Sequence, residues 1–541
     1  MSEAVRTRIG GHVVVNALEA LGAETAFGLP GVHALGIWEA LRSSSVRYVG
    51  FRTELNAAFA ADGYARAGGK PAALLLSTGP GALNSLTGLM EASSAHVPLV
   101  AIASQIPHDL IGRGRGYLHE MRDQRASFEP IVKWAARARS AEDVPELLAE
   151  AWQRAQTPPS GPVFVEIPVD VLTGETDLRV TELDGSPAAP ALPPANRLDE
   201  AARVVAGAER PLVWAGSGVL RSGAWDELRA VAEALRAPVV TSYMGKGAFP
   251  EDHELSAGSA CDEAAFRELV ESADAVLVAG SELGAETTQQ YTLHFGGQLI
   301  QIDADEERIG ASFPALGLVG DARATLAALA ERLPRRQPDG RAEERARAVG
   351  ERIGSGLDEQ GRELERGLLA SIRAALPREV AAGWDMTILA YWAGAHFPAL
   401  EPRRFLYPLG SGTLGYAWPA ALGAAVALGQ PTLAVAGDGG FLYGVQELAT
   451  ARQYHLPTTL LLVDDGGYGI LREYQRDAYG ETFAVDLEQP DFPELVRSFG
   501  VPVEPATPDA LADALRRALA TDGPAVVHLP VHLETWTPTR S

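Results

Sequence analysis

The segment TLAVAGDGGFLYGVQELATARQYHLPTTLLLVDDGGYGI, residues 432–470, contains two apolar strand patterns that each end in an acidic, glycine-rich loop. The first strand, 432–436, meets a Gly-Asp-Gly-Gly turn that contains Asp438, and the second, 458–463, ends at Asp464 and Asp465. Residues 441–454 between them carry apolar side chains at helical spacing. In a parallel sheet, neighbouring strands end at the same edge, where open α/β sheets bind ligands. We therefore expect Asp438 and Asp465 to converge.

Two carboxylates and a loop carbonyl are hard oxygen ligands, which suit Mg²⁺, and Mg²⁺ usually completes its octahedron with water and phosphate oxygens. The implied ligand is a diphosphate. The alternative is that both aspartates are ordinary turn residues, because Asp and Gly dominate turns in any case.

In these two acidic loops the chain resembles a known family, the thiamine diphosphate (ThDP) enzymes related to acetolactate synthase, pyruvate decarboxylase and benzoylformate decarboxylase. Their cofactor motif opens with Gly-Asp-Gly, as at Gly437-Asp438-Gly439, and closes with two Asn, where this chain has Asp464-Asp465. The substitution keeps an oxygen ligand and adds charge. The resemblance implies that Mg²⁺ is bound by Asp438, Asp465 and the carbonyl of Gly467. It also implies that the cofactor-binding loops include Gly437, Gly439, Gly440 and Tyr468.

The stretch RTELNAAFAADGYAR around Glu54 resembles the family's signature for the glutamate that bonds the aminopyrimidine. An alanine-rich helix allows close packing, so we expect Glu54 to be nearly buried, which would raise the pKa of its carboxyl. The resemblance implies that Glu54 promotes the tautomer whose nitrogen removes the thiazolium C2 proton. A plain alternative is that Glu54 only favours the first turn of a helix.

Three further loops follow predicted strands in the first part of the chain. Gly28-Leu29-Pro30-Gly31-Val32-His33 places His33 where carboligating or C–C-cleaving lyases of the superfamily have a histidine. Ser77-Thr78-Gly79-Pro80-Gly81 has a family counterpart that lines the pyrimidine pocket, so Thr78 is expected there. The segment IGRGRGYLHEMRDQ supplies His119 and several arginines that could meet a carboxylate. Histidines suit proton transfer near neutral pH, although His33 could equally be a helix-start residue without chemistry.

The hexapeptide Gly410-Ser411-Gly412-Thr413-Leu414-Gly415 fits the dinucleotide fingerprint G-x-G-x-x-G, with Asp438 about 20 residues further on, as a ribose-binding acid requires. An NAD(P)-binding oxidoreductase is therefore the main competing hypothesis from another class. In the ThDP reading, the carbonyl of Gly412 accepts from the aminopyrimidine, and Leu414 wedges the two cofactor rings together. We prefer this reading because it accounts for both acidic loops and for Glu54.

Composition and length bound the remaining possibilities. The chain has 541 residues and a formal charge of −24, which argues against a nucleic-acid partner. The single cysteine, Cys261, excludes an intrachain disulfide. We find no apolar signal core and no stretch of the roughly 20 residues that span a bilayer, so we expect a cytoplasmic protein without membrane contact.

The pattern of elements predicts the α/β class, with three consecutive doubly wound parallel-sheet domains. By the resemblance these are a pyrimidine-binding domain at 1–180, a central Rossmann-like domain at 190–335 and a diphosphate-binding domain at 360–541. Some relatives hold FAD in the central domain, and the residues here favour neither its presence nor its absence. Because Glu54 and the metal loops fall in different domains, which come from different subunits in this family, the resemblance implies a homodimer at least, and many relatives are homotetramers.

Which 2-oxo acid reaction follows depends on the pocket. Pyruvate decarboxylase-like enzymes have an acidic residue where this chain has Val32, and a glutamate that helps protonation where it has Leu471. The missing donors favour transfer of the acyl carbanion to a second carbonyl, as in acetolactate synthase-like carboligation. Simple 2-oxo acid decarboxylation, of the benzoylformate or indolepyruvate type, or C–C bond cleavage is the alternative, in which His33 and His119 would deliver protons.

Overall fold

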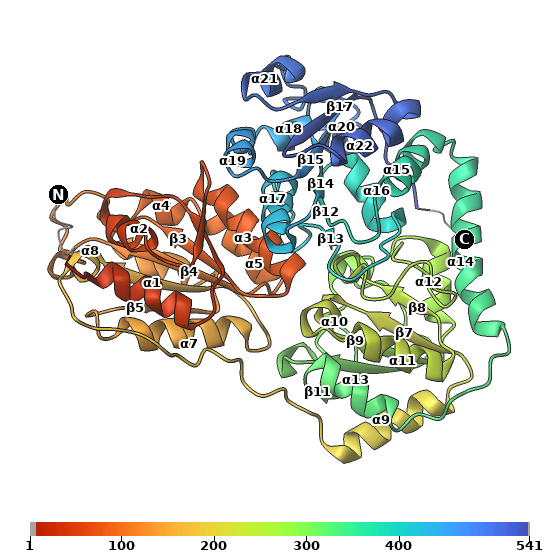
Figure 1. Cartoon of the computed structure of the whole chain (residues 1–541). Coiled ribbons are helices and arrows are strands. Elements are labelled where there is room, and N and C mark those ends of the chain that lie inside the picture. Colours follow the sequence, from red (N-terminus) through yellow and green to blue (C-terminus); the bar gives the residue numbers. More distant parts are fainter. Residues whose placement is uncertain (1–6, 539–541) are drawn as a thin grey trace. The chain divides into compact units, whose positions relative to one another are not determined.

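A computed structural model describes residues 7–538 and contains three parallel β-sheets, as the sequence pattern predicts (Figure 1). The first sheet has the strand order β2-β1-β3-β4-β6-β5, the second β11-β10-β9-β7-β8 and the third β13-β12-β14-β15-β17-β16. The strands of the first sheet are β1 (Thr25–Gly28), β2 (Arg47–Gly50), β3 (Ala72–Leu76), β4 (Leu99–Gln105), β5 (Trp134–Arg137) and β6 (Val163–Pro168). Those of the second are β7 (Pro211–Ala215), β8 (Val239–Thr241), β9 (Ala275–Ala279), β10 (Gln298–Asp303) and β11 (Leu316–Val319). Those of the third are β12 (Ala382–Trp384), β13 (Phe405–Leu406), β14 (Thr432–Gly437), β15 (Thr458–Asp464), β16 (Val503–Pro505) and β17 (Ala525–Pro530).

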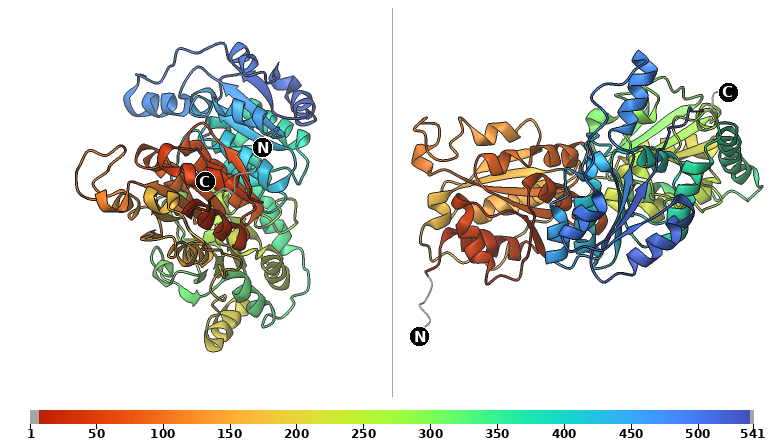
Figure 2. Two further views of the ribbon diagram at one scale, coloured as in Figure 1. Left: turned by 60° about the vertical axis from the view of Figure 1, so that its left-hand side comes forward. Right: turned by 90° about the horizontal axis from the view of Figure 1, so that it is seen from above.

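Helices connect the strands of each sheet, as parallel pairing requires, and Figure 2 shows them from two further sides. Around the first sheet these are α1 (Gly10–Ala20), α2 (Leu35–Leu41), α3 (Glu54–Gly68), α4 (Pro80–Leu83), α5 (Leu86–Ser94), α6 (Gln124–Phe128), α7 (Val144–Gln156) and α8 (Val169–Thr173). Around the second are α9 (Ala195–Gly207), α10 (Ser217–Ser222), α11 (Trp225–Leu235), α12 (Ala264–Glu271) and α13 (Ala322–Ala330). The remaining helices are α14 (Arg341–Glu359), α15 (Glu363–Ala375), α16 (Ile388–His396), α17 (Ala417–Leu428), α18 (Asp438–Phe441), α19 (Glu447–Gln453), α20 (Gly469–Tyr479), α21 (Phe492–Ser498) and α22 (Leu511–Leu519).

Both faces of the first sheet are covered at its centre, which explains why β3 is apolar throughout. Ala73 and Leu75 of β3 belong to a core shared with α1 and α7. Because side chains alternate along a strand, Leu74 and Leu76 face the opposite side, and both are fully buried. The second sheet has a comparable core with α9, α11 and α13.

The chain packs as two compact units whose boundaries do not follow the sequence order. One unit combines the first sheet with Pro408–Gln430 and Tyr443–Thr458, and the other contains Ala189–Tyr407, Pro431–Leu442 and the chain from Thr459 onward. In the first unit α3 and α17 pack backbone against backbone: a Cβ atom at Gly63 would lie 2.0 Å from the carbonyl oxygen of Ala420, and one at Gly423 would lie 1.8 Å from that of Ala60. Glycine is required at both positions, because any side chain would overlap the opposite helix.

Some expected elements are shorter than the sequence pattern predicts. Strand β13 extends only over Phe405–Leu406, because Pro408 lacks the N–H that a sheet ladder needs. The helix expected at 441–454 is divided between the end of α18 and α19, and the interval contains Gly444. Between residue 184 and the start of α9 at Ala195 the chain has no helix or strand. No helix within residues 7–538 is long and apolar enough to cross a membrane.

Candidate active site

Glu54 is the first residue of α3, where Thr53 caps the helix by accepting a hydrogen bond from the amide of Asn56. The carboxylate of Glu54 accepts from Asn84 Nδ2 at 3.1 Å, and a Cβ atom at Gly81 would lie 3.2 Å from its Oε1. Glu54 thus faces the loop after β3, as expected. It is partly exposed rather than nearly buried, because it stands at the end of the helix and not within its alanine-rich middle.

Thr78 is buried in that loop, and its hydroxyl shares a 2.8 Å hydrogen bond with Ser104 at the end of β4. Gln124 completes the connection: its Oε1 accepts from the amide of Gly79 at 2.7 Å, and its Nε2 donates to the carbonyl of Ser104 at 3.1 Å. Gly79 has φ of 61°, which favours glycine. The loop that contains Thr78 is therefore held rigidly against the next strand. Gln124 was not predicted, since nothing in the sequence links it to Thr78.

The two candidate histidines lie together. The rings of His33 and His119 have centroids 5.4 Å apart and planes 76° apart, which is an edge-to-face contact. His33 is 5% exposed, and its Nδ1 has no hydrogen-bond partner among residues 7–538. Burial, and then the nearby His119, lowers the pKa of His33. His33 is therefore neutral near pH 7, and its free Nδ1 can exchange a proton.

His119 also lies against the loop after β3, since a Cβ atom at Gly79 would be 2.8 Å from the carbonyl oxygen of His119. The backbone of His119 has φ of 64°, an uncommon conformation for a non-glycine residue. Tyr117 packs on His33 from the same segment, with ring centroids 5.7 Å apart. The segment at 111–122 thus brings one histidine to the other. Its arginines 113, 115 and 122 are exposed.

Gly412 and Leu414 lie in the loop between β13 and α17. Gly412 has φ of 71° and its amide donates to the carbonyl of Pro408 at 2.9 Å. Next to it, the amide and hydroxyl of Ser411 donate to the buried carboxylate of Glu91 at 2.7 and 2.8 Å. Leu414 is partly exposed. The loop therefore has a fixed backbone and a leucine side chain available for contact.

Asp438 begins α18 directly after β14, and β14 and β15 are neighbours in the third sheet, as expected. Asp438 is 1% exposed; its Oδ1 accepts from the amide of Gly439 at 2.8 Å and its Oδ2 from Gln489 Nε2 at 2.5 Å. A Cβ atom at Gly439 would lie 2.7 Å from the ring of Tyr468, so the loops after β14 and β15 are in direct contact. The predicted convergence of the two acidic loops is thus observed in the fold.

The remaining glycines of the first loop are crowded. A Cβ atom at Gly440 would lie 3.1 Å from the carboxyl carbon of Asp385, and one at Gly437 would lie 3.1 Å from the hydroxyl of Thr387. In the second loop, Gly467 has φ of 152°, and a Cβ atom there would lie 2.3 Å from the carbonyl oxygen of Val485. Glycine is required at Gly467, where a side chain would overlap backbone, whereas a side chain at Gly437 or Gly440 would need a small shift of Thr387 or Asp385.

The electrostatics of the two loops suit a cation. The pKa of Asp438 is raised to about 6 by burial and by the nearby carboxylates of Asp465 and Asp464, against the effect of the Gly439 amide. Burial also raises the pKa of Asp465, which Arg472 opposes. A divalent cation would favour both carboxylates in their charged forms. Among residues 7–538 no three His, Cys, Asp or Glu side chains form a metal site, so the protein offers two carboxylates plus backbone oxygens.

Known families match the chain over all three sheets. Models of the thiamine pyrophosphate enzyme N-terminal TPP binding domain, central domain and C-terminal TPP binding domain match residues 8–127, 198–329 and 385–529. The chain therefore belongs to the thiamine pyrophosphate enzymes and is a ThDP-dependent enzyme. The third match includes Gly410–Gly415 and assigns that glycine-rich hexapeptide to a TPP binding domain rather than to a dinucleotide-binding one.

Individual relatives include a probable decarboxylase and several acetolactate synthases. A probable 2-ketoarginine decarboxylase of Pseudomonas aeruginosa is 37% identical over 530 residues, which is 97% of this chain and 94% of the relative. A probable acetolactate synthase large subunit of Methanocaldococcus jannaschii is 31% identical over 96% of this chain and 92% of its own. Among solved structures, one described as a thiamin diphosphate-dependent enzyme of Mycobacterium smegmatis has a TM-score of 0.80 at 29% identity, covering 97% of this chain and 99% of that one.

Proposed function

We propose that the protein catalyses the ThDP- and Mg²⁺-dependent decarboxylation of a 2-oxo acid to an aldehyde. The observation that carries this proposal is the contact between His33 and His119 beside the loop of Thr78. When bound, ThDP supplies an electron sink for the carbanion left by the departing CO₂. Asp438, Asp465 and the carbonyl of Gly467 would hold Mg²⁺, while Glu54, Thr78, Gly412 and Leu414 would hold the pyrimidine. By the same resemblance, we propose a homodimer at least.

The histidine pair is suited to deliver one proton. Burial and then the nearby His119 lower the pKa of His33, so the His33 imidazole is neutral near pH 7. The buried Nδ1 of His33 lacks a partner among the described residues, so it can accept a proton from a neighbouring donor without breaking an existing bond. The two histidines thereby offer the proton donor that the sequence lacks at Leu471. The missing donor at Leu471 was the reason that the sequence favoured carboligation. Decarboxylation thus moves ahead of carboligation in our proposal.

The surroundings of α20 favour a substrate with a cationic end. Tyr474 is 54% exposed on this helix, and the pKa of its phenol is raised by burial, by Glu286 and then by Glu473 and Asp262. The hydroxyl of Tyr243 donates to Asp262 Oδ2 at 2.7 Å. Within residues 7–538, neither Asp262 nor Glu286 forms an ion pair with a cationic side chain, and burial raises the pKa of the Asp262 carboxyl.

Carboxylates and tyrosine rings together bind guanidinium groups by charge-assisted hydrogen bonds and cation–π contacts. The 37% identical relative is named a probable 2-ketoarginine decarboxylase, and 2-ketoarginine is a 2-oxo acid that ends in a guanidinium. We therefore propose 5-guanidino-2-oxopentanoate, or a 2-oxo acid with a similar cationic end, as the substrate.

Incubation with ThDP, Mg²⁺ and a panel of 2-oxo acids should release CO₂ and aldehyde in equal amounts. We expect the guanidino acid to react faster than pyruvate or 2-oxohexanoate, an uncharged acid without the guanidinium. CO₂ and products are measured by mass spectrometry. The variant His119→Asn should lower aldehyde release by about 10²-fold, because the proton donor is lost. Condensation products such as acetolactate in place of aldehyde would contradict decarboxylation.

Glu286→Gln should raise the KM for the guanidino acid about tenfold or more, since a hydrogen bond to a charged group contributes roughly 1.5–3 kcal/mol. The KM for 2-oxohexanoate should stay unchanged, because that acid has no positive charge. Glu282→Gln, in the same loop with its carboxylate 3.7 Å from Arg308, is the matched control and should alter neither constant. Equal effects of Glu286→Gln on both acids would contradict the cationic substrate.

Carboligation remains the second candidate. Leu471 is 43% exposed on α20 and brings no proton donor, and the acetolactate synthase relatives match nearly the whole chain. The same panel separates the two reactions, because a 2-hydroxy-3-oxo acid product identifies transfer of the acyl group to the carbonyl of a second 2-oxo acid.

A further inference from the structure

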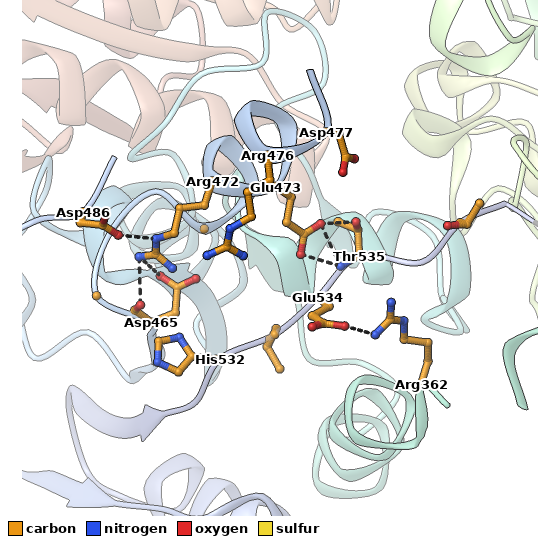
Figure 3. A pocket seen from close by; sticks show the side chains of 14 residues that line it. Arg362, Asp465, Arg472, Glu473, Arg476, Asp477, Asp486, His532, Glu534 and Thr535 are labelled. Carbon is orange, nitrogen blue, oxygen red and sulfur yellow. Dashed lines mark hydrogen bonds and ion pairs between the residues drawn. The ribbon is translucent and has the colours of Figure 1, made fainter. Parts of the chain in front are cut away.

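Arg472 of α20 covers the loop that contains Asp465 (Figure 3). Its Nη2 donates to the carbonyl oxygen of Asp465 at 3.0 Å and lies 3.7 Å from the carboxylate Oδ1 of the same residue. Its Nε donates to Asp486 Oδ1 at 2.7 Å. The side chain is only 12% exposed, so this guanidinium is fixed between the two aspartates.

The loop that Arg472 covers is held by backbone hydrogen bonds to residues 485–487. The amide of Tyr468 donates to the carbonyl of Val485 at 2.8 Å, and the amide of Leu487 donates to the carbonyl of Gly466 at 3.1 Å. Gly467 leaves room for the guanidinium, since a Cβ atom there would lie 2.9 Å from Nη2. Arg472 therefore holds the peptide of Asp465 and overlies that of Gly467, the two residues proposed as metal ligands in this loop.

Negative charge is concentrated around this loop. Asp464 and Asp465 stand where the resembled motif has two neutral asparagines, so the loop carries additional negative charge. Asp464 has its own partner, His528 Nε2, at 2.9 Å. The guanidinium of Arg472 lies 3.7 Å from the carboxylate of Asp465, so its positive charge offsets negative charge at that residue.

We propose that Arg472 is a positioning residue for the metal site: it offsets the charge of Asp465 and fixes the carboxylate and peptide of that residue, and it thereby sets the affinity for Mg²⁺ with ThDP. The proposal rests on the proposed function, because it takes Asp465 as a ligand of Mg²⁺. Residues outside the ligand shell that orient metal ligands commonly change metal affinity when they are replaced.

Arg472→Gln should weaken Mg²⁺-dependent ThDP binding by about 10- to 100-fold. The unopposed carboxylates would then repel both each other and the diphosphate. The measurement is a calorimetric titration of the full-length protein with ThDP at fixed Mg²⁺, without substrate. Arg472→Lys keeps the charge and should retain more affinity than Arg472→Gln.

The double variant Asp465→Asn/Arg472→Gln distinguishes charge compensation from a merely structural role. Removing the additional charge should restore most of the affinity lost in Arg472→Gln, whereas a structural role predicts no rescue. Arg476→Gln is the matched control: it lies one turn further along α20, is exposed and lines the same pocket, of about 760 Å³. Its affinity should equal that of the unmodified protein.

The outcomes separate this inference from the proposed function. Unchanged binding in Arg472→Gln, or no rescue in the double variant, would overturn the role of Arg472 while leaving decarboxylation standing. A protein that binds ThDP without any dependence on Mg²⁺ would overturn the metal assignment and this inference together. Normal titration curves without aldehyde production would contradict only the proposed reaction.

Discussion

Glu54→Gln is expected to lower kcat by about 10²- to 10⁴-fold, the usual contribution of a positioned proton-transfer group. The amide cannot take or hold the proton that the carboxylate of Glu54 would exchange with the aminopyrimidine. The fold should survive, because Glu54 is partly exposed at the start of α3 and Gln can still accept from Asn84 Nδ2. CO₂ release under saturating ThDP and Mg²⁺ measures the rate, and thermal unfolding measures the stability.

Glu39→Gln provides the matched control, since this carboxylate lies on α2 outside the loops of the candidate site and pairs with Arg42 at 3.2 Å. It should leave both rate and melting temperature unchanged. Full turnover in Glu54→Gln would contradict the cofactor activation assigned to Glu54. A parallel fall in melting temperature would instead show that the carboxylate is needed for the fold.

Asp438→Ala is expected to weaken Mg²⁺-dependent ThDP binding by more than about 100-fold, because a direct ligand should matter more than the residues that orient it. Its carboxylate is the more buried of the two candidate ligands, and it lies in the loop that contacts Tyr468. Titration of ThDP at several Mg²⁺ concentrations measures the effect. The dependence on Mg²⁺ should disappear along with the affinity.

Asp477→Ala tests whether any loss of negative charge near the site has the same effect. Asp477 is exposed on α20 and lines the pocket that also contains Asp465. Binding should be unchanged in this variant. Equal affinities of Asp438→Ala and the unmodified protein would exclude Asp438 as a metal ligand.

The fold follows from sequence features that act over short distances. Apolar runs at 72–76, 432–436 and 458–463 predicted β3, β14 and β15 almost to the residue, because strands covered on both faces leave a continuous apolar signal. The order of β14 and β15 followed from the general geometry of parallel sheets. Less certain from sequence were short strands such as β2 and β5, whose half-exposed residues give no continuous signal.

The candidate site likewise contains residues that the sequence could identify and residues that it could not. Asp438, Asp465 and Glu54 could be selected from their motifs, since the residue types and the spacing carry the chemistry. The near burial expected for Glu54 was wrong, because exposure depends on which elements pack at the end of a helix and not on the helix sequence alone. Gln124, Gln489 and Arg472 were not selected, because polar residues in loops or on an exposed helix resemble ordinary surface residues.

The sequence by itself determined the class of fold and the family, and it predicted which residues would bind a diphosphate with a cation, because these depend on local patterns and on motif spacing. Only the tertiary structure brought His33 to His119 and placed Arg472 on Asp465. Contacts of this kind depend on where loops from separate strands meet at the edge of a sheet. No local pattern encodes that meeting, since it is decided by the packing of the whole domain.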